Sequence, residues 1–139
     1  MKTIRSVLIV DDNQADIEIA SYFLNKNGNV RNLLVAEDGK EALSLFEQFQ
    51  SSCVTLNGKF PPRVILLDIN MPKLNGFEFL ERYAELNLDF NQPVVILMLT
   101  SSEFVGDIEK ADNNPLVQGY ITKPFSREKA IEICEKFGE

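Results

Sequence analysis

Four short apolar runs in the sequence each end at a side chain that could take part in phosphoryl chemistry. In chain order they end at Asp11-Asp12, Asp68, Thr100 and Lys123. Short apolar runs separated by helical stretches are typical of buried parallel strands. In an open α/β sheet, ligands bind beyond the carboxyl ends of such strands. The sequence therefore predicts three carboxylates, a hydroxyl and an ammonium at one edge of a sheet, a set that suits an anion together with a divalent cation.

The three carboxylates indicate a magnesium site. Asp11 and Asp12 are adjacent, so their side chains would point to opposite faces of a strand unless the chain turns there toward Asp68. Two unit charges about 4 Å apart repel by about 4 kcal/mol at an effective dielectric constant of 20. A cluster of this kind persists when a cation offsets the repulsion. Mg²⁺ is suitable because it prefers hard oxygen ligands and binds one or two carboxylates together with phosphate oxygens.

Asp68 is the predicted phosphoryl acceptor. It ends the central and most apolar run, where burial fixes its position, and carboxylates are established covalent acceptors of phosphoryl groups. Phosphoryl transfer needs mainly positioning and charge neutralisation, which Lys123 and the hydroxyl of Thr100 can supply beside a metal. Pro124 restricts the backbone of Lys123 and raises the chance of a cis bond before the proline. Thr100 alone indicates little, because threonine is common in strands.

The hydrophobic pattern that positions these residues predicts five alternating β-α units. Alternation of this kind implies an α/β fold with a doubly wound parallel sheet and helices on both faces. The predicted strands are 7–10, 32–36, 64–67, 94–99 and 119–122, and the predicted helices are 14–26, 38–49, 77–86, 102–112 and 126–137. Asn13, Asp38 and Ser126 are the expected N-caps, Asp38 with Glu41 as a capping-box variant. The helix at 14–26 is apolar around much of its circumference, which fits either packing between two neighbours or a face for docking a partner.

Composition bounds the remaining possibilities. The 139 residues predict one domain, 1–139, with its core at about 5–137. The chain has no histidine, which excludes Ser-His-Asp and Cys-His catalysis and histidine-ligated zinc. The net charge of −7 argues against a nucleic-acid partner. No apolar stretch approaches the roughly 18 residues of a membrane span, and the N-terminus enters the first strand directly, so we expect a cytoplasmic protein without a membrane partner.

Two further features have simple expected roles. Cys53 and Cys134 show no metal-ligand spacing and are expected to be reduced and structural. The polar segment Ser51 to Pro62 is long for a connection between a helix and a strand, and we interpret it as a surface insertion.

The chain resembles the receiver domain of two-component response regulators from about residue 5 to residue 137. The matching motifs are Asp11-Asp12, Asp38-Gly39 with Glu41-Ala42-Leu43, Asp68-Ile69-Asn70-Met71-Pro72, Asn75-Gly76, Thr100-Ser101 and Lys123-Pro124-Phe125. Each motif is weak alone, but in this order and at these spacings they are highly specific. The resemblance implies a flavodoxin-like (βα)5 fold with strand order 2-1-3-4-5. The long segment at 51–62 departs from the family pattern, and Asn75 stands where aspartate is also common.

The resemblance also implies roles for individual residues. Asp68 would accept a phosphoryl group from the phosphohistidine of a histidine kinase or a histidine phosphotransfer protein. Asp11 and Asp12 would bind Mg²⁺ with Asp68 and the backbone carbonyl of Asn70.

Switching would involve three other residues. Lys123 would pair with the phosphoryl group, Thr100 would move toward it, and Tyr120 would rotate inward in step. These changes would alter the surface formed by the fourth helix, the fifth strand and the fifth helix. Without the resemblance, Tyr120 is only an aromatic residue in a strand. The lifetime of the adduct is not predicted; Asn70 and Ser102, two positions beyond Asp68 and Thr100, are the residues at which its determinants would be sought.

The sequence thus predicts a stand-alone response regulator that is a phospho-acceptor rather than an enzyme, and that binds a downstream protein as a monomer or as a phosphorylation-linked dimer. Two alternatives stay open: a phosphorelay shuttle that passes the phosphoryl group on, and a receiver-like interaction module that is never phosphorylated. An aspartyl-phosphate phosphatase of the haloacid dehalogenase type is disfavoured because Asn70 stands where its second aspartate belongs. A flavodoxin-like cofactor binder is disfavoured because Asp11 and Asp12 would repel the cofactor phosphate.

Overall fold

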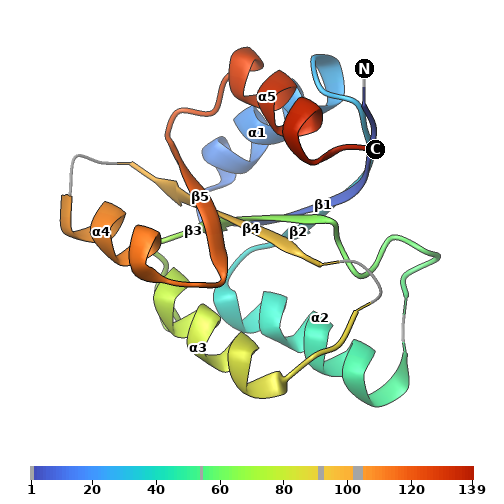
Figure 1. Ribbon diagram of the computed structural model, residues 1–139, viewed down its shortest axis with the longest axis vertical. Coiled ribbons are helices and arrows are strands. Elements are labelled where there is room, and N and C mark those ends of the chain that lie inside the picture. The colour runs from blue at the N-terminus through green and yellow to red at the C-terminus, as the bar shows by residue number, and fades with distance from the viewer. Residues whose placement is uncertain (1, 54, 91–92, 102–104) are drawn as a thin grey trace.

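In the computed structural model, which describes residues 2–53, 55–90, 93–101 and 105–139, five parallel strands form one sheet in the order β2-β1-β3-β4-β5 (Figure 1). The predicted α/β fold class and strand order are confirmed. Sheet and helices alternate along the chain as β1 Ile4–Val10, α1 Gln14–Lys26, β2 Val30–Ala36, α2 Gly39–Ser52, β3 Val64–Asp68, α3 Gly76–Leu86, β4 Val95–Thr100, α4 Val105–Asn113, β5 Val117–Thr122 and α5 Arg127–Phe137. No helix of these described segments is long and apolar enough to cross a bilayer.

The helices cover both faces of the sheet, with α1 and α5 on one face and α2 and α3 on the other (Figure 1). Residues alternate between the two faces along each strand. In β1, Leu8 and Val10 belong to the core under α2 and α3, whereas Val7 and Ile9 belong to the core under α1 and α5. The strands β1, β3 and β4 are buried on both sides almost throughout. This explains why they read as continuous apolar runs.

The element boundaries differ from the expected ones by a few residues. The strand β2 begins at Val30, two residues earlier than expected, and β4 includes Thr100 as its last residue. The expected start of the fourth helix at Ser102 lies outside the described residues. The hydrophobic pattern of a segment locates a strand or helix more sharply than it locates the residues at which that element begins and ends.

Side-chain caps fix where the helices begin. Asn13, Asp38 and Ser126 accept hydrogen bonds from the backbone N–H three residues later, as expected. The reciprocal half of the box at Asp38 is absent among the described contacts, because the Glu41 carboxylate accepts from the N–H of Glu37 instead. A reciprocal capping box forms instead at α3.

In that α3 box, Asn75 accepts from the N–H of Glu78 and the Glu78 carboxylate accepts from the N–H of Asn75. The box sets the start of the helix that follows the Asp68 loop.

The segment 51–62 is more than a surface insertion. Helix α2 continues through Ser52, and Phe60 is buried with its ring centroid 4.8 Å from that of Phe46. The guanidinium of Arg5 donates hydrogen bonds to the carbonyls of Gly58 and Pro61, at 2.8 and 2.7 Å. The segment is therefore fastened to both the core and β1.

Two side chains, those of Cys53 and Tyr22, depart from their expected environments. Cys134 is buried as expected, but Cys53 is exposed and ends α2 in the left-handed conformation, and both thiols are free. Tyr22 of α1 is 53% exposed, so packing between neighbours accounts for only part of the wide apolar surface of that helix.

Candidate functional site

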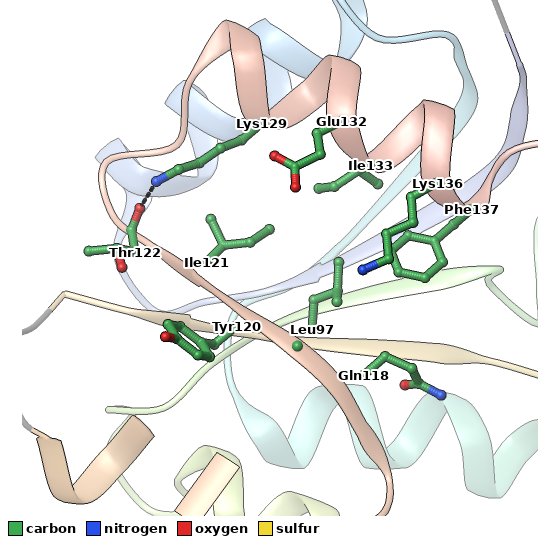
Figure 2. Close-up of a pocket in the computed structure, with 11 residues that line it drawn as sticks. Leu97, Gln118, Tyr120, Ile121, Thr122, Lys129, Glu132, Ile133, Lys136 and Phe137 are labelled. Atoms are coloured by element: carbon green, nitrogen blue, oxygen red, sulfur yellow. Dashed lines mark hydrogen bonds between the residues drawn. The ribbon is translucent and has the colours of Figure 1, made fainter. Parts of the chain in front are cut away.

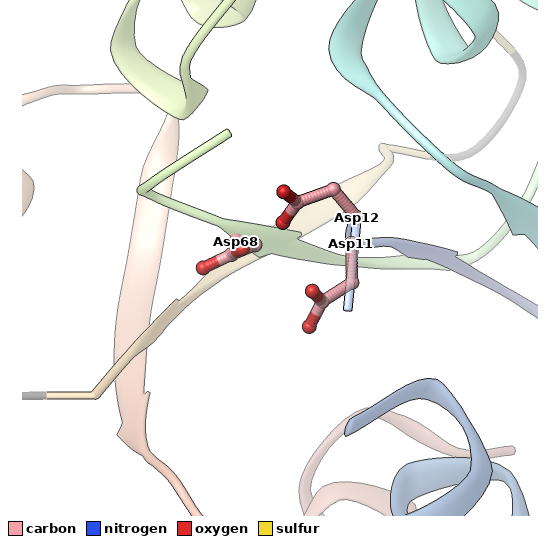
Figure 3. Close-up of side chains that lie close together, drawn as sticks. All are labelled: Asp11, Asp12 and Asp68. Atoms are coloured by element: carbon pink, nitrogen blue, oxygen red, sulfur yellow. The ribbon is translucent and has the colours of Figure 1, made fainter. Parts of the chain in front are cut away.

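The loop after β1 turns Asp11 and Asp12 toward the same point at the carboxyl edge of the sheet. The N–H of Asp11 donates to Ala36 on β2, and Asp11 Oδ1 accepts from the N–H of Asn13 at 2.9 Å. Asp11 is buried, whereas Asp12 is exposed. One carboxylate oxygen from each of Asp11, Asp12 and Asp68 lies within 4.8 Å of the other two (Figure 3). The structure therefore brings the three acids together, as their positions at the strand ends indicated.

Asp68 is held at the end of β3 by the packing of α3. The N–H of Gly76 donates to the carbonyl of Ile69, and a Cβ at Gly76 would lie 2.6 Å from the carbonyl oxygen of Asp68. Only glycine permits this approach, which gives a physical reason for the Asn75-Gly76 motif. The Asp68 carboxylate also receives a long 3.4 Å contact from the N–H of Asn70.

Burial and crowding make the Asp68 carboxyl hard to ionise. Burial, followed by the charge of Asp11, raises the pKa of Asp68 from 3.8 to about 7, although Lys123 opposes the rise. In the metal-free protein, a large fraction of Asp68 is therefore protonated at neutral pH. A cation at this point would favour the ionised form that a nucleophile needs.

Lys123 is positioned by the sheet and surrounded by carboxylates. Its N–H donates to the carbonyl of Thr100 at 2.7 Å, and the bond to Pro124 is cis. Its Nζ lies 2.9 Å from Asp11, 2.8 Å from Asp16 and 3.5 Å from Asp68. Burial alone would lower the pKa of Lys123, but the carboxylates outweigh burial and raise it well above its ordinary value. Lys123 is thus a permanent cation next to Asp68.

Asp16 is the site residue that was not predicted. Its carboxylate accepts an aligned hydrogen bond from Lys123. From the sequence alone, Asp16 is only an acid near the start of the helix predicted at 14–26. The position of Asp16 in the sequence could have indicated its place in the site. A helix that begins at Gln14 has its first turn next to the loop of Asp12, at the same edge of the sheet.

The structure has a buried oxygen that a metal would satisfy. Asp11 Oδ2 is buried and has no aligned hydrogen bond among the described residues, although Lys123 Nζ lies 2.9 Å away. Unsatisfied buried carboxylate oxygens are unfavourable. Three clustered carboxylates and a nearby backbone turn are the oxygen-rich donor set that Mg²⁺ prefers. The residues present therefore fit a divalent cation.

The two predicted switch residues occupy different environments. Thr100 is buried at the end of β4, opposite Thr122 of β5. Tyr120 is 42% exposed and lines a groove of about 250 Å³ between β5 and α5. In Figure 2, Lys129 of α5 reaches across one end of this groove to the carbonyl of Thr122. Thr100 is thus buried at the carboxyl end of β4, whereas Tyr120 is exposed on the surface of β5.

The chain is similar to proteins of known family. The family model of the response regulator receiver domain matches residues 7–135. The chain is 29% identical over 133 residues to the probable methanogenesis regulatory protein FilR2 of Methanothrix harundinacea, covering 96% of this chain and 81% of that protein. It is 28% identical over 139 residues to hybrid signal transduction histidine kinase L of Dictyostelium discoideum, covering 99% of this chain but only 8% of the kinase.

A solved structure has the same fold. The chemotaxis protein CheY4 of Vibrio cholerae superposes with a TM-score of 0.67 at 26% identity, covering 96% of this chain and 98% of that one.

Proposed function

Because the chain belongs to the response regulator receiver domain family of two-component signalling, whose members are phospho-acceptors rather than classical enzymes, we propose that it accepts a phosphoryl group on Asp68 from a partner's phosphohistidine. The observation that carries the proposal is the convergence of Asp68 with two further carboxylates and a lysine at one edge of the sheet.

The cation site of the proposal consists of Asp11, Asp12, Asp68 and the backbone carbonyl of Asn70. Receiver domains generally bind Mg²⁺ through such an acidic cluster, and the buried oxygen of Asp11 supports the same role here. When bound, Mg²⁺ neutralises carboxylate charge and attracts phosphoryl oxygens.

The transfer step uses the ionised carboxylate of Asp68. One of its oxygens attacks the phosphorus of the donor, a P–O bond forms, and the P–N bond to the partner's imidazole breaks with its electron pair leaving on nitrogen. Burial among carbon atoms and the packing of Gly76 hold the nucleophile in place. Lys123, 3.5 Å from Asp68, offers a positive charge to the transferred group.

The output of the proposed function is a change of surface. In this proposal Thr100, which is buried at the end of β4, donates a hydrogen bond to a phosphoryl oxygen. In this proposal Tyr120 then turns inward from its exposed position, which reshapes the α4–β5–α5 surface and its groove. The roles of Thr100 and Tyr120 follow the family pattern, and the contrast between the buried threonine and the exposed tyrosine supports them.

The proposed partners are a histidine kinase or histidine phosphotransfer protein and a downstream protein, both of which receiver domains meet in general. We include in the proposal a stand-alone role in the cytoplasm, as a monomer or a phosphorylation-linked dimer, with no nucleic-acid or membrane partner. The acidic net charge of −7 supports the exclusion of nucleic acid.

The test is the intact mass of the protein after incubation with acetyl phosphate and Mg²⁺. We expect a labile phosphoryl adduct that is absent when a chelator is present and absent in Asp68→Asn. The matched control, Asp112→Asn, removes an exposed aspartate of α4 and should form the adduct normally. An adduct that persists in Asp68→Asn would refute the assignment, and no adduct in the unchanged protein would favour the interaction module that is never phosphorylated.

A further inference from the structure

Lys123 directs its hydrogen bond away from the proposed phosphoryl acceptor. Its Nζ lies 2.8 Å from Asp16 Oδ2 with hydrogen-bond geometry, whereas Asp68 Oδ1 is 3.5 Å away. Asp11 Oδ2 is near the ammonium but receives no aligned hydrogen bond within the described segments. Among the three carboxylates that lie near Lys123, that of Asp16 is therefore the best-aligned acceptor. Asp16 is not part of the cluster formed by Asp11, Asp12 and Asp68.

The two residues belong to elements that are far apart in the chain. Asp16 is in the first turn of α1, and Lys123 follows the last residue of β5, 107 positions later in the chain. The ion pair thus connects the start of α1 to the end of β5. The same turn of α1 is held by Asn13, which accepts from the N–H groups of Asp16 and Ile17, both at 3.1 Å.

Phosphorylation would change which anion attracts Lys123 most. A phosphoryl group carries a charge of roughly −1.5 to −2, against −1 for a carboxylate. The side chain of Asp68 is 7% exposed and that of Asp16 is 29% exposed, so water screens the attraction to Asp16 more strongly. Both differences favour the phosphoryl group on Asp68 as the partner of the ammonium.

We infer that Asp16 is a positioning residue that accepts the hydrogen bond of Lys123 in the unphosphorylated protein and loses this hydrogen bond to the phosphoryl group when Asp68 is phosphorylated. This inference rests on the proposed function of Asp68. Its consequence is that the first turn of α1 is stabilised by the Lys123 ammonium only in the unphosphorylated protein. The state of the phosphoryl site is thereby transmitted to α1 as well as to β5.

A purely local role for Asp16 makes a different prediction. Acidic residues in the first turn stabilise any helix through its dipole, and Glu128 occupies such a position in α5. A dipole effect does not depend on Asp68. The response to phosphorylation therefore separates the two roles.

The experiment measures amide hydrogen exchange by NMR, with Mg²⁺ alone and with Mg²⁺ plus acetyl phosphate. The reporter is the N–H of Ile17, which makes the first backbone bond of α1 with Asn13. The internal reference is the N–H of Ala130, which makes the equivalent bond of α5 with Ser126. Intact mass on the same samples shows whether the adduct is present.

In the unchanged protein we expect exchange of the Ile17 N–H to rise by up to about fivefold on phosphorylation, because the loss of one partly exposed ion pair changes an equilibrium constant by at most about that factor. Exchange of the Ala130 N–H should be unaffected. Asp16→Asn should exchange faster at Ile17 before phosphorylation and respond no further. Glu128→Gln, the matched control, should keep the full response at Ile17.

Two results would overturn the inference: an adduct without faster exchange at Ile17, or an equal response in Asp16→Asn. In either case the proposed function of Asp68 would stand, because the adduct is detected separately. Absence of the adduct would instead overturn both.

Discussion

Replacing Asp68 with asparagine should stabilise the metal-free protein, and by an amount that depends on pH. The change removes an ionisable group from a buried position next to Asp11 while keeping the size of the side chain. In the native protein Asp68 holds its proton up to a pKa of about 7, whereas in the unfolded chain it loses the proton near 3.8. Between these values the native state binds more protons, so raising the pH lowers the free energy of unfolding.

The size of this effect follows from the difference in pKa. A rise from 3.8 to about 7 corresponds to a loss of about 4 kcal/mol once the pH exceeds both values. The loss begins near pH 4 and is complete above about pH 7. Asp68→Asn lacks the titrating carboxyl group. The difference in free energy of unfolding between this variant and the unchanged protein should therefore grow by about 2 to 4 kcal/mol between pH 4 and pH 8.

The assay is urea unfolding followed by circular dichroism at several pH values, without metal and with saturating Mg²⁺. The exposed-residue variant Asp112→Asn should track the unchanged protein at every pH. Mg²⁺ should reduce the advantage of Asp68→Asn, because the cation binds the native unchanged protein selectively. A stability difference between Asp68→Asn and the unchanged protein that is the same at pH 4 and pH 8 would refute the claim that burial and the charge of Asp11 raise the pKa of Asp68.

Three further predictions concern other parts of the site. Lys123→Ala should destabilise the metal-free protein by about 3 kcal/mol, because it leaves the buried Asp11 charge unpaired. Thermal unfolding should show that Mg²⁺ restores much of this lost stability. Equal losses with and without the ion would contradict the reasoning. Thr100→Ala should still form the phosphoryl adduct but should abolish the shift of the Tyr120 ring resonances on phosphorylation, and a shift of unchanged size would argue against a switch role for Thr100. Asn75→Ala should lower the free energy of unfolding by about 1 kcal/mol through loss of the α3 capping box, measured by urea unfolding, and no change would show that the box is energetically neutral.

The parts of the fold that follow from local rules could be predicted from the sequence. Strands buried on both faces are continuous apolar runs, and Asn13 and Ser126 are N-caps that act within three residues. The meeting of Asp11 and Asp68 also follows, because the carboxyl ends of parallel strands share an edge.

Features that depend on packing between distant segments could not be predicted in the same way. The contact of Asp16 with Lys123 depends on how closely α1 approaches the end of β5. The burial of Phe60 depends on the space beside Phe46, and the sequence around it contains only the polar and proline signals of a loop. The exposure of Cys53 arises from its left-handed position after α2, which the type of residue does not indicate.

The central claim is that Asp11, Asp12 and Asp68 form one site for a divalent cation, and calorimetric titration of the protein with MgCl₂ tests it most directly. We predict uptake of a single ion, lost in Asp11→Asn and unchanged in the exposed-residue variant Asp112→Asn. No binding by the unchanged protein, or equal binding by Asp11→Asn, would contradict the account.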